Sequence, residues 1–64
     1  MSHSIIKLPR VKGLTSLSRS AIYAKVANGE FPRPIKLGER AVGWIESEIN
    51  DWITARAAER GGAS

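Results

Sequence analysis

Residues 14–23 constrain the fold of this chain more than any other segment. A short helix is expected to begin near Pro9, since a proline in the first turn forfeits no hydrogen bond, and to end near Leu14. Residues 15–18 then form a polar turn in which Leu17 is the apolar exception. Ser18 is a favourable N-cap for a second helix that extends to about residue 28. The segment therefore predicts two helices joined by a tight turn.

The second helix has two faces of different character. Ile22 and Val26 are four residues apart and form a stripe for the core. The opposite face carries small and polar residues with one aromatic: Arg19, Ser20, Tyr23, Ala24 and Ala27. Such a face lets the helix approach another surface closely. Asn28-Gly29 is a helix-stop signal.

A hairpin and a third helix are expected to follow. Pro32 and Pro34 exclude a helix, and residues 35–37 and 41–44 alternate as two strands around a turn at 38–40. A two-stranded ribbon is unstable alone, so its apolar side, with Ile35 and Leu37, is expected to rest on the helices. Residues 46–60 then repeat apolar side chains at helical spacing, before two glycines that end the helix: Ile49, Trp52, Ile53 and Ala57.

The size of the chain allows one small domain. We expect this domain to span residues 6–60 of the 64, with flexible ends at 1–5 and 61–64, and residues 5–8 to form a short strand or an extended lead-in. The chain has no cysteine, and His3 is its only histidine, so the sequence predicts no metal site, no cofactor and no enzyme activity. No apolar stretch is long enough for a signal peptide or a membrane span, so a cytoplasmic protein is expected.

The charge of the chain is unevenly distributed. Residues 1–45 carry eight Lys and Arg against two Glu, a net charge of +6, whereas residues 46–64 carry two Arg against four acids, a net charge of −2. Helix, turn, helix and then a basic hairpin is an order of elements typical of DNA-binding proteins. We therefore expect a mainly α winged helix-turn-helix with a small β-hairpin as its wing, and double-stranded DNA as its partner.

The expected DNA contacts come from the second helix and the hairpin. The first turn of the helix would lie nearest to base edges, and the basic hairpin would hold the backbone or enter the minor groove. The candidate residues are Ser18, Arg19, Ser20, Tyr23, Ala24, Lys25, Arg33, Lys36 and Arg40. A purely structural role stays open for each one: Tyr23 half-buries its ring, Arg19 pairs with an acid, or Arg33 only solubilises the loop.

Several stretches resemble the AlpA-type prophage regulators, which are related to MerR-like winged-helix domains and to excisionases. They are Leu8-Pro9-Arg10-Val11, Leu17-Ser18-Arg19-Ser20-Ala21-Ile22-Tyr23, Gly29-Glu30-Phe31-Pro32-Arg33-Pro34-Ile35, Ala41-Val42-Gly43-Trp44, Glu46-Ser47-Glu48-Ile49 and Trp52-Ile53. The resemblance covers about residues 6–60. It implies a recognition helix that starts at residues 18–20, a wing at 36–42, and regulation of genes in a prophage or mobile element.

Two positions depart from the family pattern. Ser16 stands where glycine commonly follows the threonine of the turn, and Ala24 stands where arginine often follows the tyrosine. The second departure implies a different set of contacts in the groove.

Three alternative functions are compatible with these residues. The first is a sequence-specific transcriptional regulator, and the second is an excisionase-like factor that bends DNA at an attachment site and directs an integrase. The third, from another class, is a protein-interaction module that inhibits a host or phage factor. One such domain contacts few base pairs, so a homodimer or cooperative assembly on DNA is expected.

Overall fold

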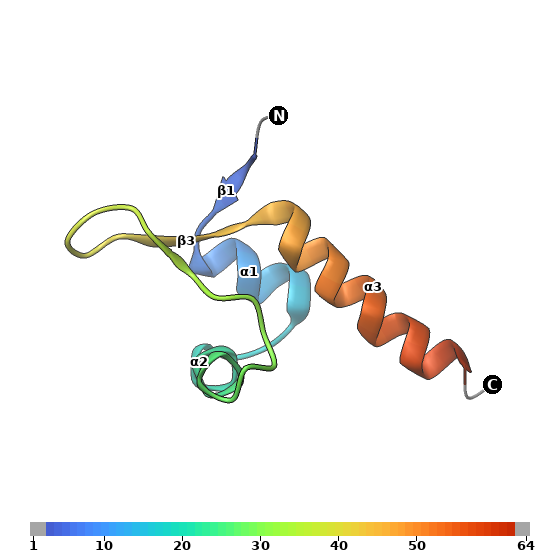
Figure 1. Ribbon diagram of the computed structural model, residues 1–64. Coiled ribbons are helices and arrows are strands. Elements are labelled where there is room, and N and C mark those ends of the chain that lie inside the picture. Colours follow the sequence, from blue (N-terminus) through green and yellow to red (C-terminus); the bar gives the residue numbers. More distant parts are fainter. Residues whose placement is uncertain (1–2, 63–64) are drawn as a thin grey trace.

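The computed structural model describes residues 3–62, which form three helices and a three-stranded sheet (Figure 1). The strands are β1 (Ile5–Ile6), β2 (Ile35–Lys36) and β3 (Val42–Ile45). The helices are α1 (Leu8–Thr15), α2 (Arg19–Ala27) and α3 (Glu46–Gly62). The mainly helical class with a small antiparallel hairpin is thus as predicted. Residues 1–2 and 63–64 of the predicted flexible ends lie outside the described residues.

The sheet has one strand more than the predicted ribbon. Its order is β1-β3-β2, with Ile5 paired to Ile45 and Ile6 paired to Trp44. The Glu46 amide also donates a 2.8 Å hydrogen bond to the Ser4 carbonyl. Ile5 and Ile6 therefore form a short strand, which is one of the two conformations expected for residues 5–8. The added strand has a physical reason, because a β-branched pair beside the open edge of β3 supports a ribbon that is marginal alone.

The predicted orientation of the hairpin is wrong. Trp44 is fully buried among the helices, and Lys36 pairs with Val42, which lies on the same side of β3 as Trp44. Ile35 and Leu37 consequently point away from the helices and are 37% and 46% exposed. The alternation of side chains along β2 was predicted correctly. Which side of β2 faces the core, however, is decided by the register between β2 and β3, the strand that carries Trp44.

The core lies where the three helices meet the inner side of the sheet. It consists of five buried residues, Val11, Ile22, Phe31, Trp44 and Ile49. The Trp44 indole donates a 3.0 Å hydrogen bond to the Pro32 carbonyl, which ties the loop after α2 to β3. Leu17 packs against this core, and so does Val26, as its place in the apolar stripe of the second helix predicts.

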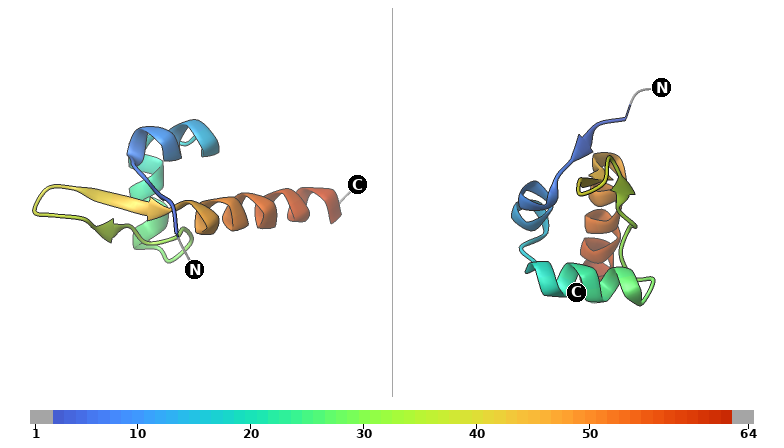
Figure 2. Two further views of the ribbon diagram at one scale, coloured as in Figure 1. Left: turned by 90° about the horizontal axis from the view of Figure 1, so that it is seen from above. Right: turned by 90° about the vertical axis from the view of Figure 1, so that its left-hand side faces the viewer.

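The third helix is longer and more exposed than predicted. It continues through Gly62, and its second half extends away from the rest of the protein (Figure 2). Ala57, which the helical spacing places in one apolar stripe with Ile49 and Ile53, is therefore exposed. Trp52 and Ile53 of the same stripe pack against the core but are only half-buried, because the rest of the domain does not extend beyond them. None of the helices described is long and apolar enough to cross a membrane.

Candidate nucleic-acid interface

The turn before α2 is fixed by its own polar side chains. The Thr15 hydroxyl donates to the Val11 carbonyl at 2.8 Å and accepts from the Leu17 amide at 3.3 Å. Ser16 adopts the left-handed conformation with φ of 61°, and its amide donates to the Lys12 carbonyl at 2.8 Å. Thr15 therefore ends α1, and the turn is shorter than the predicted residues 15–18.

Ser18 caps α2 as predicted. Its hydroxyl accepts a 3.1 Å hydrogen bond from the Ala21 amide, and its backbone is extended. The cap exposes Arg19 and Ser20 in the first turn, where helix amides carry a partial positive charge. No acidic residue lies within α2. The helix ends at Ala27 with Asn28 as its C-cap, and Gly29 follows in the left-handed conformation with φ of 73°. The N-terminal end of α2 is thus a rigid, exposed and electropositive surface.

Tyr23 is more buried than the sequence predicted. It is half-buried, and its ring meets that of Trp44 edge-on at a centroid distance of 6.2 Å. The Arg19 guanidinium lies 5.6 Å from the centroid of the same ring. The Tyr23 ring therefore has the half-buried, structural role that the sequence left open, and it orients Arg19 over the first turn of α2. Ala24 is exposed, and Lys25 is half-buried.

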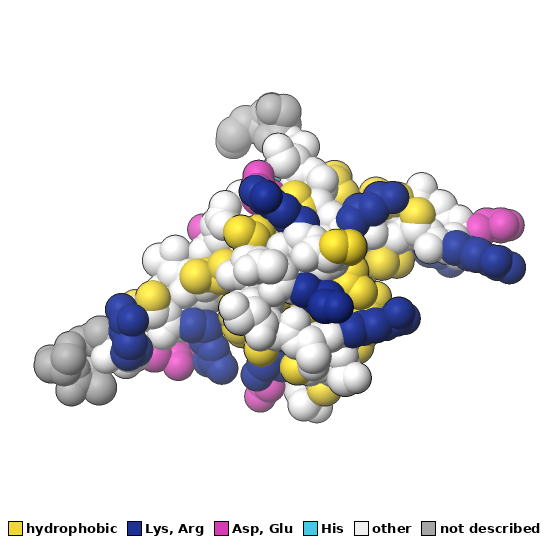
Figure 3. Space-filling view, turned by 180° about the vertical axis from the view of Figure 1, so that it is seen from behind, with side chains coloured by type: hydrophobic (Ala, Val, Ile, Leu, Met, Phe, Trp, Pro, Cys, Tyr) yellow, Lys and Arg dark blue, Asp and Glu magenta, His cyan; other side chains and the backbone are white. Residues whose placement is uncertain are grey.

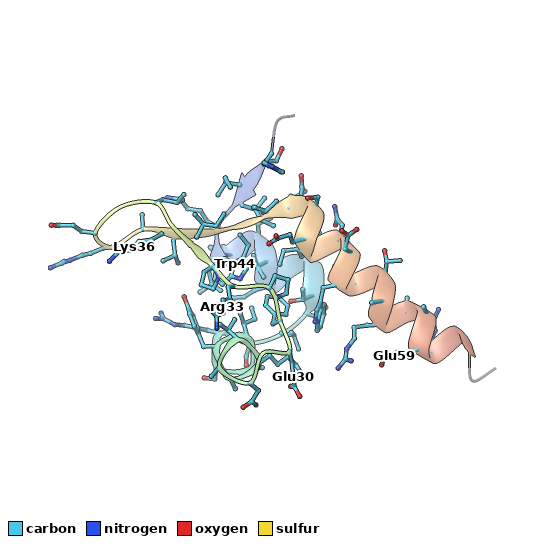
Figure 4. All side chains as sticks on the ribbon, viewed as in Figure 1. Glu30, Arg33, Lys36, Trp44 and Glu59 are labelled. Atoms are coloured by element: carbon cyan, nitrogen blue, oxygen red, sulfur yellow. The ribbon has the colours of Figure 1, made fainter. Side chains whose placement is uncertain are left out.

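The hairpin carries two of the candidate cations. Lys36 projects from the side of β2 that faces the helices, and Arg40 is exposed at the turn. The Leu37 amide closes this turn with a 2.7 Å hydrogen bond to the Ala41 carbonyl. Figure 4 shows Lys36 on the projecting hairpin and Arg33 on the loop between the hairpin and α2. The inverted orientation of β2 thus turns Lys36 toward the same side as α2.

The opposite view shows how the charges are distributed. Lys and Arg side chains spread across this face, and the acidic side chains lie toward its margins (Figure 3). Arg33 differs from the other candidates because it also lines a groove whose remaining charged residues are acidic: Glu30, Glu48 and Asp51. Within residues 3–62, no three His, Cys, Asp or Glu side chains gather as a metal site would require.

Sequence reasoning missed the exposed outer side of the sheet. A Cβ atom added to Gly43 would lie 2.5 Å from the Ile5 Cγ2 atom and 3.1 Å from the Leu37 Cδ1 atom. Ile5, at 41% exposed, therefore covers Gly43 together with Leu37 on the side away from the helices. The signal in the sequence was Gly43 itself, since a glycine within a strand marks a close approach of other atoms.

The fold and this face define a small, mainly helical domain with a capped, electropositive helix beside a basic hairpin. Residues 4–57 match the family model described as "Prophage CP4-57 regulatory protein (AlpA)". The chain therefore belongs to the AlpA family of prophage regulatory proteins.

Two curated proteins are similar to it. The "DNA-binding transcriptional activator AlpA" of Escherichia coli strain K12 is 36% identical over 58 residues, which cover 81% of this chain and 83% of that protein. The "Uncharacterized protein ORF88" of Enterobacteria phage P4 is 42% identical over 55 residues, which cover 86% of this chain. This chain spans 62% of the length of the phage P4 protein.

Proposed function

We propose that this chain is a winged helix-turn-helix protein that binds double-stranded DNA and regulates transcription in a prophage or integrated element. The observation that carries the proposal is the first turn of α2. Ser18 caps it, Arg19 and Ser20 are exposed there, and Tyr23 orients Arg19. The N-terminal residues of a recognition helix are those that contact base edges.

The hairpin would act as the wing. Lys36 is on the side of the sheet that faces the helices, and Arg40 is at the exposed turn, so both cations are available to phosphates that flank the groove. Ser18, Ala24, Lys25 and Arg33 complete the proposed contact set, with Ala24 allowing close approach because its side chain is small. The family membership and the name of the E. coli relative support the same role.

The remaining parts of the proposal follow from DNA binding. The protein is not an enzyme, and it works on the chromosome in the cytoplasm. It acts as a homodimer or as a cooperative assembly, because one small domain contacts too few base pairs to select a genomic site.

A salt series with matched variants tests the interface. Arg19→Gln and Lys36→Gln should each weaken binding, and each lost phosphate contact should reduce the slope of log affinity against log salt by about 0.9. Arg60→Gln in the second half of α3 removes the same charge away from α2 and should leave the slope unchanged. Equal effects of all three variants would contradict the proposed face.

A further inference from the structure

Arg19 leaves α2 on the flank of the helix that faces the sheet. Its guanidinium lies 5.6 Å from the centroid of the Tyr23 ring, and that ring meets the Trp44 ring of β3 edge-on at 6.2 Å. At about 100° per residue, Arg19 and Tyr23 are only about 40° apart round the helix axis. The contact with the ring therefore directs the Arg19 side chain along this flank and not away from the body of the domain.

The outward face of α2 carries Ser20 and Ala24 instead. Ala24 is about 160° round the axis from each residue of the inward stripe, Ile22 and Val26, and Ser20 is about 40° from Ala24. Both outward side chains are exposed. The Ser18 hydroxyl is engaged in the cap, so Ser20 supplies the hydroxyl that this face offers to a ligand. The methyl group of Ala24 beside it leaves room for a close approach.

Lys36 belongs to the same flank as Arg19. It pairs with Val42 and so lies on the side of the sheet that carries Trp44, against which Tyr23 packs. The hairpin projects to one side of α2 only (Figure 1). Both cations are exposed, and within the part of the chain that the structure describes neither forms an ion pair within 4.0 Å. Two unpaired cations beside the helix match the charge of a DNA backbone.

We propose that Arg19 and Lys36 hold the backbone of one DNA strand beside the major groove, and that Ser20 is the residue of the first turn that reads a base. This division of roles rests on the proposed DNA binding. A guanidinium on the flank forms a strong, charge-assisted hydrogen bond with a phosphate, which carries no sequence information. A hydroxyl on the outward face reaches the base edges, where it donates or accepts a hydrogen bond.

The test starts from duplexes that the unmodified protein enriches from a pool of random sequences. Arg19→Gln and Lys36→Gln should each keep the same preferred sequence, weaken binding to all sequences alike, and reduce the slope of log affinity against log salt by about 0.9. Ser20→Ala should keep the slope and lose about 2- to 10-fold of the discrimination at one base pair. The matched control Ser47→Ala, an exposed serine of α3, should change neither quantity.

Methylphosphonate linkages, which remove the charge of single phosphates in the enriched duplex, locate the backbone contacts. One linkage should weaken the unmodified protein but not Arg19→Gln, and the linkage that behaves in this way with Lys36→Gln should lie on the same strand. An altered base preference of Arg19→Gln, an unaltered one of Ser20→Ala, or linkages on opposite strands would overturn the division of roles. If the unmodified protein enriches no sequence, sequence-specific DNA binding itself is refuted.

Discussion

Replacing Ser16 by glycine should stabilise the protein. Ser16 is the only non-glycine residue with positive φ among residues 3–62, and this conformation costs a residue with a Cβ atom about 1–2 kcal/mol. Glycine, however, loses more backbone freedom on folding, and this entropic cost offsets about 0.5–1 kcal/mol of the strain that the substitution relieves. The Ser16 side chain is exposed, and the hydrogen bond to the Lys12 carbonyl comes from the amide, which glycine retains. The free energy of unfolding should therefore rise by about 0.5–1 kcal/mol.

Thermal unfolding followed by circular dichroism measures this change. For a chain of this size, 1 kcal/mol corresponds to about 4–8 °C, so Ser16→Gly should raise Tm by roughly 2–8 °C. The matched control is Ser47→Gly on the exposed surface of α3, where the same substitution should cost about 0.5 kcal/mol because the residue is helical. A Tm that falls with Ser16→Gly, or that moves equally in both variants, would refute the reasoning about the turn.

Three further changes test other parts of the structure. Ser18→Ala removes the N-cap of α2 and should lower the free energy of unfolding by about 1 kcal/mol in urea titrations. An unchanged urea midpoint would show that the cap does not stabilise the protein. Gly43→Val places side-chain atoms against Ile5 and Leu37 and should cost about 1–3 kcal/mol in the same assay, whereas wild-type stability would mean that the outer side of the sheet is loose. Tyr23→Phe keeps the ring beside Arg19 and should leave DNA affinity unchanged, whereas Tyr23→Leu should raise Kd about 2- to 5-fold; a loss with Tyr23→Phe would show that the hydroxyl contacts DNA.

The local signals of the sequence predicted most of the elements correctly. Ser18 as a cap, Gly29 as a stop and the paired prolines each act within a few residues, so their effect can be recognised without the tertiary structure. The same is true of Arg19 and Ser20, which the cap places in the first turn of α2.

The errors concern contacts between distant segments. The pairing of β1 with β3 depends on Ile5 reaching Ile45, and the orientation of β2 depends on the register between Lys36 and Val42. A two-residue strand carries too little periodicity to reveal either pairing. Ala57 fits the helical stripe in the sequence, but only the extent of the body beneath α3 decides where that stripe ceases to be buried.

The most direct test of the central claim is binding to duplex fragments from around the protein's own gene and from the attachment site of its element, across a salt series. With about 4–6 phosphates contacted per bound copy, log affinity should fall with log salt with a slope near −4 to −5, and one fragment should keep its advantage as salt rises. A preferred promoter fragment supports the transcriptional regulator, and a preferred attachment site supports the excisionase-like alternative. Equal binding to every fragment that vanishes at moderate salt would contradict specific DNA recognition.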